Sequence, residues 1–262
     1  MSERKIAISV KNLEKSFDGR KVLDDVTMDI YQGEIFVIMG GSGCGKSTLL
    51  RHMSGAIRGD AGSVYFGDKD LTKLNDDEME MVKRRFGMSF QSAALIDYMN
   101  VEENVSLPLR EHTGLDPKII NIIVKMKLNL VGLQGYEDLF PSMLSGGMKK
   151  RVGLARAIAM DPEVVFYDEP TAGLDPVVCA VVDQLIADLS KKLLLTSIVV
   201  THNMESVFRI ADRIAMLYKG KVLQVGTPQE IKNSDNPIIQ QFINGRIEGP
   251  ISFADQDGGG EG

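Results

Sequence analysis

GGSGCGKST, residues 40–48, is a glycine-rich stretch that follows an apolar run and precedes a helical segment. It matches the pattern G-x-x-x-x-G-K-[ST], which forms a phosphate loop when it lies between a strand and a helix. The backbone N–H groups of such a loop, and the amino end of the following helix, point at phosphate oxygens. We therefore expect an ATP site in which Lys46 contacts the β- and γ-phosphates and Ser47 offers its hydroxyl to Mg²⁺. The residues predicted to contact ATP in this loop are Gly40, Gly41, Ser42, Gly43, Cys44, Gly45, Lys46, Ser47 and Thr48.

The charge balance limits the classes of partner. The chain has 262 residues and a net charge of −6, which argues against a dedicated nucleic-acid binder, whose surface is usually basic. Two short basic clusters, residues 83–85 and 149–151, are interpreted as solvated helix surface. We expect no nucleic-acid partner.

Cysteine usage and hydropathy indicate a chain without disulfides or membrane spans. Cys44 and Cys179 are far apart and have no metal-ligand spacing, so reduced thiols are expected rather than a disulfide. Residues 1–11 lack the apolar core of a signal peptide. No run of 18 apolar residues occurs, so no membrane-spanning helix is expected.

The distribution of apolar runs predicts an α/β fold. EIFVIMG (34–40), EVVFYDEP (163–170) and TSIVVTH (196–202) are continuous apolar runs, typical of parallel strands buried on both faces. Helical segments separate them, which favours a mostly parallel core sheet of βαβ units. Residues 5–13 and 21–34 alternate instead, and they predict a small antiparallel β subdomain at the amino end.

A helical lobe is predicted over about residues 92–160, within an ATPase domain that spans residues 1–245. One face of a helix in this lobe should carry an apolar stripe at helical spacing, and we interpret that stripe as core packing within the lobe. The residues of the stripe are Ile119, Ile123, Met126, Leu130 and Leu133.

Residues 246–262 are predicted to be a partly disordered carboxyl-terminal extension. Its last eight residues have no apolar content, so they are expected to be disordered. Ile247, Ile251 and Phe253 lie before them and suit burial against another surface. A tail that crosses to a dimer partner and a frayed terminus both remain open.

Polar residues at the ends of the apolar runs predict hydrolysis. Asp168 is expected to hold Mg²⁺ through water, and Glu169 to polarise the attacking water. A solvated acidic turn is the less favoured interpretation, because the ends of buried strands rarely carry two acids without a cation. His202 is expected to contact the γ-phosphate or the water. Gln91 is expected to contact both Mg²⁺ and the helical lobe.

LSGG at residues 144–147 offers a second anion site at the start of a helix. Ser145 has a hydroxyl, and Gly146 and Gly147 have free backbone N–H groups. The phosphate loop, Gln91, LSGG, VVFYDEP, TAGLD (171–175) and His202 occur in that order. Over about residues 6–232 the chain resembles the nucleotide-binding domain of ABC (ATP-binding cassette) ATPases.

This resemblance implies a head-to-tail homodimer that sandwiches two ATP molecules. Ser145, Gly146 and Gly147 of one subunit would then contact the nucleotide held by the phosphate loop of the other. Asp175 would lie at the subunit interface, and Phe17 would stack on adenine in place of the tyrosine common in the family.

Three local stretches resemble one subgroup, the ATPases of Mce-type phospholipid transporters. These are Met148 after the two glycines, the segment of residues 90–115 and the segment of residues 240–253. The resemblance implies a motor on the cytoplasmic face of a bacterial inner membrane, held there by a permease. It also implies an MCE-domain protein and, in some systems, a STAS-domain subunit as partners, with phospholipid as the cargo.

Three alternatives share part of the pattern. An ABC importer for amino acids or ions would have the same catalytic residues. A soluble ABC protein of repair or translation would typically carry two cassettes or a long coiled-coil insertion. A kinase with a phosphate loop would lack the LSGG stretch.

Overall fold

Two β-sheets form the centre of the protein in the computed structural model, which describes residues 4–251. The antiparallel sheet has four strands in the order β2-β1-β4-β5. The second sheet has six strands in the order β10-β9-β3-β8-β7-β6, and only the edge pair β10–β9 is antiparallel. The strands are β1 (Ile6–Phe17), β2 (Arg20–Tyr31), β3 (Ile35–Met39), β4 (Ala61–Phe66), β5 (Lys69–Asp70), β6 (Phe86–Ser89), β7 (Val164–Asp168), β8 (Thr196–Val200), β9 (Arg213–Tyr218) and β10 (Lys221–Gly226).

The predicted α/β class, with its parallel core sheet and amino-terminal antiparallel strands, is confirmed. The three continuous apolar runs are β3, β7 and β8, which lie side by side in the parallel part of the sheet. Alternate residues of each strand enter different cores. Phe36 and Ile38 face the core shared with the antiparallel sheet, whereas Val37 and Met39 face the core formed with helices on the other side. Both faces are therefore buried, which is why these strands are mostly apolar.

The helices divide between these two cores. Their bounds are α1 (Lys46–Met53), α2 (Asp76–Lys83), α3 (Val101–His112), α4 (Pro117–Leu130), α5 (Gly146–Ala157), α6 (Pro176–Leu193), α7 (Met204–Ile210), α8 (Pro228–Lys232) and α9 (Pro237–Asn244), with a 3-10 turn, η1, at Pro141–Met143. α1 packs in the core between the two sheets, and α5, α6 and α7 cover the opposite face of the parallel sheet.

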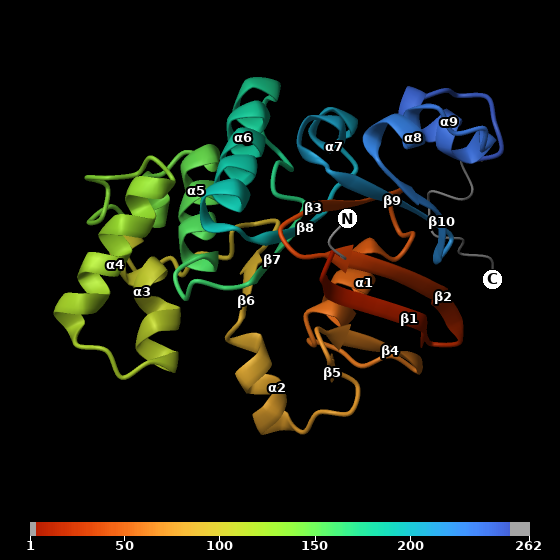
Figure 1. The fold of residues 1–262 in the computed structure, drawn as a ribbon. Coiled ribbons are helices and arrows are strands. Elements are labelled where there is room, and N and C mark those ends of the chain that lie inside the picture. The colour runs from red at the N-terminus through yellow and green to blue at the C-terminus, as the bar shows by residue number, and fades with distance from the viewer. Residues whose placement is uncertain (1–3, 252–262) are drawn as a thin grey trace.

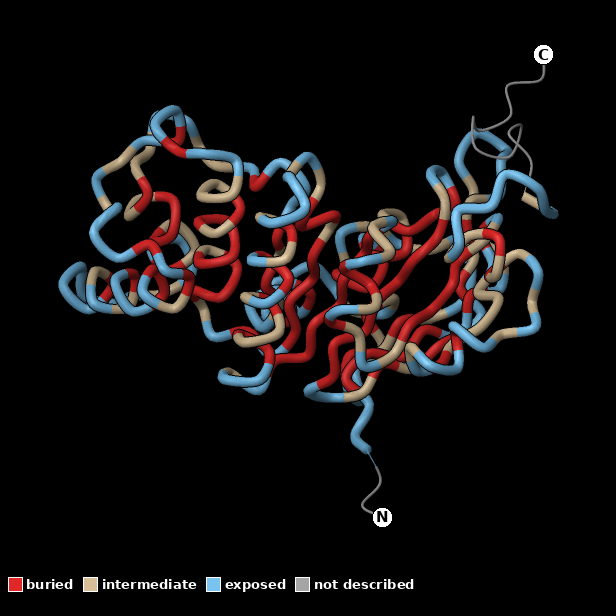
Figure 2. The backbone as a smooth tube through the Cα atoms, turned by 90° about the horizontal axis from the view of Figure 1, so that it is seen from above, coloured by how far each residue is buried: buried red, intermediate tan, exposed pale blue. Residues whose placement is uncertain are grey.

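The helical part lies at one end of the molecule. In Figure 1, α3, α4 and α5 gather at the end opposite the red and orange strands β1, β2 and β4. Figure 2 shows buried chain through the middle and exposed loops at the rims. α5 begins in this helical part and leads directly to β7, so it connects the helices to the central sheet.

The predicted apolar stripe is confirmed at three positions and wrong at two: Leu133 is buried, and Ile123 and Leu130 pack against the core. The buried residues of α4 are Ile120, Val124, Lys127 and Leu128. Ile119 and Met126, which were assigned to the core, are 47% and 62% exposed. The helix carries apolar residues on two sides, and the buried side includes Lys127, whose ammonium forms an ion pair with Asp161.

The end of the described chain folds back on α9. The side-chain amide of Gln241 bonds to backbone groups of Arg246, Ile247 and Ile251. Ile247 is 83% exposed and Ile251 is partly buried. Phe253 and the last eight residues, on which predictions were made, lie outside the described residues. Within residues 4–251, no helix has both the length and the apolar character needed to cross a bilayer.

Candidate nucleotide site

The phosphate loop connects β3 at the centre of the parallel sheet to α1. Lys46 is buried, and its ammonium donates hydrogen bonds to the carbonyl oxygens of Gly40 at 2.9 Å and Gly41 at 2.8 Å. At two positions of the loop the backbone lies so close to a neighbouring carbonyl oxygen that only glycine fits. Gly40 has φ of +157°, and a Cβ there would lie 2.2 Å from the carbonyl oxygen of Leu217. Gly45 has φ of +105°, and a Cβ there would lie 2.8 Å from the carbonyl oxygen of Val22.

The amino end of α1 is open to an anion. Its N-cap, Gly45, has no side chain to bond the first N–H groups, and the first turn carries no acid. Every other α-helix within residues 4–251 has a side-chain cap. Uncapped N–H groups at a helix amino end, with the helix dipole behind them, attract phosphate. The location and the lack of a cap suit a nucleotide phosphate.

Two predicted Mg²⁺ ligands are brought together. The Ser47 hydroxyl donates to Oδ1 of Asp168 at 3.2 Å, although 121 residues separate them. Asp168 is the last residue of β7, so the parallel sheet places it beside the start of α1. One hydroxyl, one carboxylate and phosphate oxygens are the hard oxygen ligands that Mg²⁺ takes in nucleotide sites. The residues therefore fit the ion.

Glu169 and His202 also meet, at the ends of β7 and β8. Nδ1 of His202 lies 2.8 Å from Oε1 of Glu169. The Glu169 carboxylate is mostly buried, whereas the His202 side chain is 64% exposed. Glu169 has φ of +48°, an unfavourable value for a residue with a side chain. Its N–H donates to the carbonyl oxygen of Val200 at 2.9 Å, and its own carbonyl oxygen accepts from the Ala172 N–H at 3.1 Å.

The other two predicted contacts on this side are exposed. Phe17 ends β1 and is 47% exposed, with the Lys15 ammonium 5.2 Å from its ring centroid. Gln91 follows β6 and is exposed. The structure places Gln91 two residues beyond Ser89, whose strand pairs with β7, so it lies at the same edge of the sheet as Asp168.

The LSGG residues lie at the start of α5, next to α6. A Cβ at Gly147 would lie 2.8 Å from Cγ1 of Val178, so this glycine is needed for close packing of α5 on α6. The Ser145 hydroxyl oxygen caps α5 by accepting from the Met148 N–H at 3.3 Å, which leaves its O–H free to donate. Asp175 caps α6 through the N–H groups of Val177 and Val178, both at 3.1 Å.

Met148 is partly buried and packs against the core. A polar side chain is the more common residue after the two glycines in the family that the sequence resembles. The partly buried thioether explains how an apolar residue is accommodated at this position.

Lys150 was missed by the sequence interpretation. The basic cluster of residues 149–151 was assigned to solvated helix surface, yet Lys150 is only 7% exposed. Its ammonium donates to the carbonyl oxygens of Gln91 and, at 3.4 Å, of Glu169. One feature of the sequence could have indicated that Lys150 is buried. It lies three residues before Gly153, so both residues are on one side of α5.

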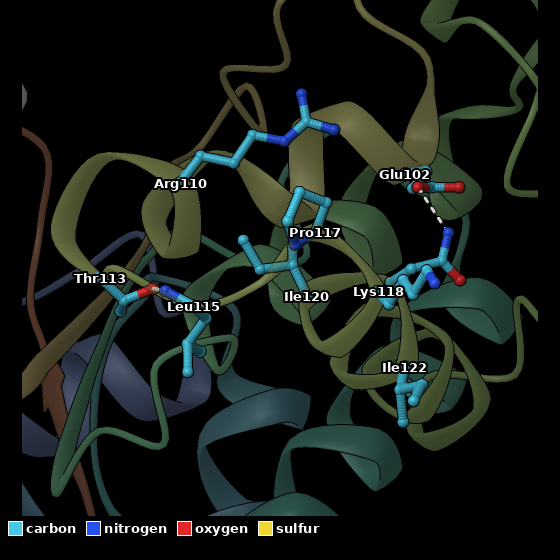
Figure 3. A pocket seen from close by; sticks show the side chains of 9 residues that line it. Glu102, Arg110, Thr113, Leu115, Pro117, Lys118, Ile120 and Ile122 are labelled. Carbon is cyan, nitrogen blue, oxygen red and sulfur yellow. Dashed lines mark hydrogen bonds between the residues drawn. The ribbon is translucent and has the colours of Figure 1, made fainter.

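A separate hollow lies between α3 and α4 (Figure 3). Its lining includes Arg110, Leu115, Lys118 and Ile122, and none of the residues predicted to contact ATP. It is therefore not part of the nucleotide site.

Comparison with known proteins agrees with this geometry. A family model described as ABC transporter matches residues 23–172. Over 246 residues the chain is 42% identical to the intermembrane phospholipid transport system ATP-binding protein MlaF of Haemophilus influenzae, covering 94% of this chain and 93% of that protein. It is 39% identical over 253 residues to the Escherichia coli K12 protein of the same name, covering 96% and 94%. A probable ribonucleotide transport ATP-binding protein, mkl, of Mycobacterium leprae is 41% identical, covering 96% of this chain and 72% of that protein.

Solved structures share the fold. The dimeric post-hydrolysis state of the ATP-binding cassette MJ0796, bound to ADP and Pi, is 30% identical with a TM-score of 0.78, and covers 84% of this chain and 98% of that chain. The cbiO1 protein of Clostridium perfringens, part of the ABC transporter complex cbiONQ, is also 30% identical with a TM-score of 0.81, covering 87% and 90%.

Proposed function

The chain belongs to the ABC transporter family of ATPases, and from that premise we propose that it is the motor subunit of a phospholipid transporter. Family membership makes it an ATP-binding protein and an ATP hydrolase. The observation that carries the cargo is the match to two MlaF proteins, at about 40% identity and over more than nine-tenths of both chains.

Binding would begin at the phosphate loop. The N–H groups at the start of α1 and the Lys46 ammonium would hold the β- and γ-phosphates. Ser47 and Asp168 would hold Mg²⁺, which would neutralise charge on the phosphates, and Gln91 would complete its surroundings. The exposed ring of Phe17 would offer its face to adenine.

Hydrolysis would depend on Glu169. A carboxylate can orient the attacking water and draw its proton, while the positive groups around the phosphates stabilise the charge that develops. The backbone bonds of Glu169 fix the start of its side chain. His202 bonds to it through Nδ1, and in its imidazolium form it would also donate from Nε2 to a phosphate oxygen.

A second subunit would complete each site. The Ser145 O–H and the N–H groups of Gly146 and Gly147 would face the γ-phosphate held by the partner's phosphate loop. Asp175, at the amino end of α6, would lie near that interface. The dimeric cassette MJ0796 supports this arrangement as a structural relative.

The membrane partner would be a permease. We propose that it docks between the sheet and the helical part, near Gln91, at the cytoplasmic face of a bacterial inner membrane. An MCE-domain protein and a STAS-domain subunit would be further members of the complex. Nucleotide-driven closure of the ATPase dimer would move the permease, and hydrolysis would reopen it.

A transporter for another solute is the second candidate, because the mkl relatives carry a ribonucleotide transport name. Those proteins extend well beyond the aligned region, since this chain covers 70–72% of them. The alignments with the MlaF proteins cover 93–94% of those proteins, which favours the phospholipid cargo.

The test is affinity purification of the tagged chain from detergent-solubilised membranes, with mass spectrometry of proteins and lipids. The Glu169→Gln chain, purified in the presence of ATP, serves as a sample in which the complex is stabilised. A strain whose chain carries no tag serves as the blank. A polytopic permease, an MCE-domain protein and phospholipid are expected. A permease with a solute-binding protein and no lipid would reject the cargo, and recovery without any membrane protein would reject the transporter.

A further inference from the structure

The loop after β6 is held by one side of α5. Lys150, Gly153 and Arg156 are spaced by three residues and so lie along the same side of the helix. The Lys150 ammonium donates to the carbonyl oxygen of Gln91. The Arg156 guanidinium donates to the carbonyl oxygens of Ala93 and Ala94, at 2.5 and 2.7 Å.

This loop has a backbone that needs such support. Ala93 and Ala94 have φ of +61° and +46°, values that alanine rarely adopts. Gly153 lets the loop approach, because a Cβ there would lie 3.3 Å from Cβ of Ala93. The conformation next to Gln91 is therefore determined by α5 as well as by β6.

Lys150 also reaches the residue proposed to hydrolyse ATP. Its ammonium lies 3.4 Å from the carbonyl oxygen of Glu169, the residue whose own φ is +48°. Lys150 is 7% exposed and forms no ion pair with a carboxylate anywhere in residues 4–251. Burial lowers the pKa of its ammonium from the ordinary value, with the nearby Glu169 charge opposing the change. A buried cation bonded to two carbonyl oxygens from different loops is a costly arrangement that a packing role alone does not explain.

We propose that Lys150 is a positioning residue that joins the Gln91 loop to the backbone of Glu169 and fixes the direction of the Glu169 carboxylate. Through this one side chain, the helix that begins with the LSGG stretch, the loop near the permease site and the hydrolytic carboxylate form one unit. The inference rests on the roles proposed above for Gln91 and Glu169.

The test compares Lys150→Met and Lys150→Gln with Lys149→Met, in the full chain as purified from solubilised membranes. Lys149 precedes Lys150 on α5 and is more exposed, and its side chain makes no hydrogen bond or ion pair with any described residue. Its substitution therefore removes the same charge without removing a side-chain contact. Lys150→Met should lower kcat by about tenfold or more, because small misplacements of a reacting group have effects of that size. ATP affinity should change by less than about twofold, given that the phosphate loop is intact.

Two further readouts separate positioning from folding. The apolar Met is expected to leave Tm unchanged or raised, because a neutral side chain in a buried site avoids the desolvation of a charge. Lys150→Gln, whose amide still donates hydrogen bonds, should retain more activity than Lys150→Met. Lys149→Met should behave as the unmodified chain.

The opposite results are equally clear. A normal kcat for Lys150→Met, or a parallel fall of kcat, ATP affinity and Tm, would overturn the positioning role. Glu169→Gln in the same assay distinguishes the two levels of proposal. If that variant hydrolyses ATP normally, the proposed role of Glu169 fails; if it is inactive while Lys150→Met is normal, only this inference fails.

Discussion

The imidazole Nδ1 of His202 lies 2.8 Å from Oε1 of Glu169, and this contact joins the ends of two neighbouring parallel strands. An ionised carboxylate can only accept hydrogen bonds, so with Glu169 ionised the imidazole donates through Nδ1–H. The contact orients the ring and leaves Nε2 facing away from the carboxylate. Both groups are thereby held beside the phosphate loop, whose strand β3 pairs with β8.

Glu169→Gln should abolish hydrolysis while ATP still binds. The amide keeps the size of the side chain and can still bond to His202, but it cannot accept a proton from water. A loss of about 100- to 10,000-fold in kcat is expected, the range typical of a general base. Phosphate release measures the rate, and light scattering with ATP should show a persistent dimer.

Glu111→Gln is a matched control for that experiment. Glu111 is an exposed residue of α3, a helix that carries none of the residues of the nucleotide site. Its substitution should leave both the rate and the oligomeric state unchanged. Normal turnover by Glu169→Gln would show that another group activates the water.

Lys46→Ala should weaken ATP binding itself. The buried ammonium organises the loop through the carbonyl oxygens of Gly40 and Gly41 and would contribute charged hydrogen bonds to phosphate. Such bonds are worth about 1.5–3 kcal/mol each, so a loss of roughly ten- to a hundredfold in affinity is expected. Titration with a fluorescent ATP analogue measures it, with the exposed Lys69→Ala as the control. Unchanged affinity would exclude Lys46 from phosphate binding.

Local patterns were sufficient to predict three strands of the parallel sheet and some of the side chains that meet at their ends. The apolar runs identified β3, β7 and β8, since a strand buried on both faces is apolar at most of its positions. The phosphate loop could be predicted because all of its residues lie in one short stretch with a fixed spacing. The proximity of Asp168 to Ser47 could also be predicted, because the carboxyl ends of parallel strands meet at one edge of the sheet.

Contacts between distant segments were not predictable in the same way. α4 has apolar residues on two sides, and periodicity could not show that Val124 is buried while Met126 is exposed. Its buried side also carries Lys127, a charge that acquires its partner, Asp161, only in the folded chain. Lys150 was misplaced for a similar reason, because its acceptors come from two loops far away in sequence.

The buried Asp183 should make stability depend on pH in a defined direction. Its side chain is fully buried on α6, and it pairs with Arg209 of α7 at 2.5 Å. Burial raises the pKa of this carboxyl above its ordinary value of 3.8, although Arg209 opposes the change. The folded state therefore holds the proton more tightly than the unfolded state. The contribution of Asp183 to the free energy of unfolding is fully present below about pH 3.8, and it is lost as pH rises through the pKa of the folded state.

The measurement is the difference in Tm between the unmodified chain and Asp183→Asn, taken from pH 4 upward. The unmodified chain should lose stability relative to the variant as pH rises, because only it must ionise a buried group. Glu205→Gln is the control, since Glu205 also approaches Arg209, at 3.7 Å, but is 74% exposed. A difference that grows in favour of the unmodified chain with pH would show that Arg209 outweighs burial.

Gln241 should limit how readily a protease cleaves the chain that follows α9. Its Oε1 accepts from the Ile251 N–H at 2.7 Å, and its Nε2 donates to the carbonyl oxygens of Ile251 and Arg246 at 3.1 and 3.3 Å. Gln241→Ala removes these bonds together, at a cost of about 1–3 kcal/mol. Trypsin should then cleave after Arg246 faster than in the unmodified chain, which gel analysis and mass spectrometry would show.

Two variants make that test specific. Gln240→Ala removes three side-chain hydrogen bonds, to the carbonyl oxygens of Lys232 and Ser234 and from the Asn244 amide. None of them reaches Ile251, so cleavage after Arg246 should not change. Gly249→Ala should reproduce the effect of Gln241→Ala, because a Cβ at Gly249 would lie 2.3 Å from Oε1 of Gln241 and displace the amide. Equal cleavage rates in all four proteins would mean that the amide does not restrain the tail, and that the packing of Ile251 alone determines its path.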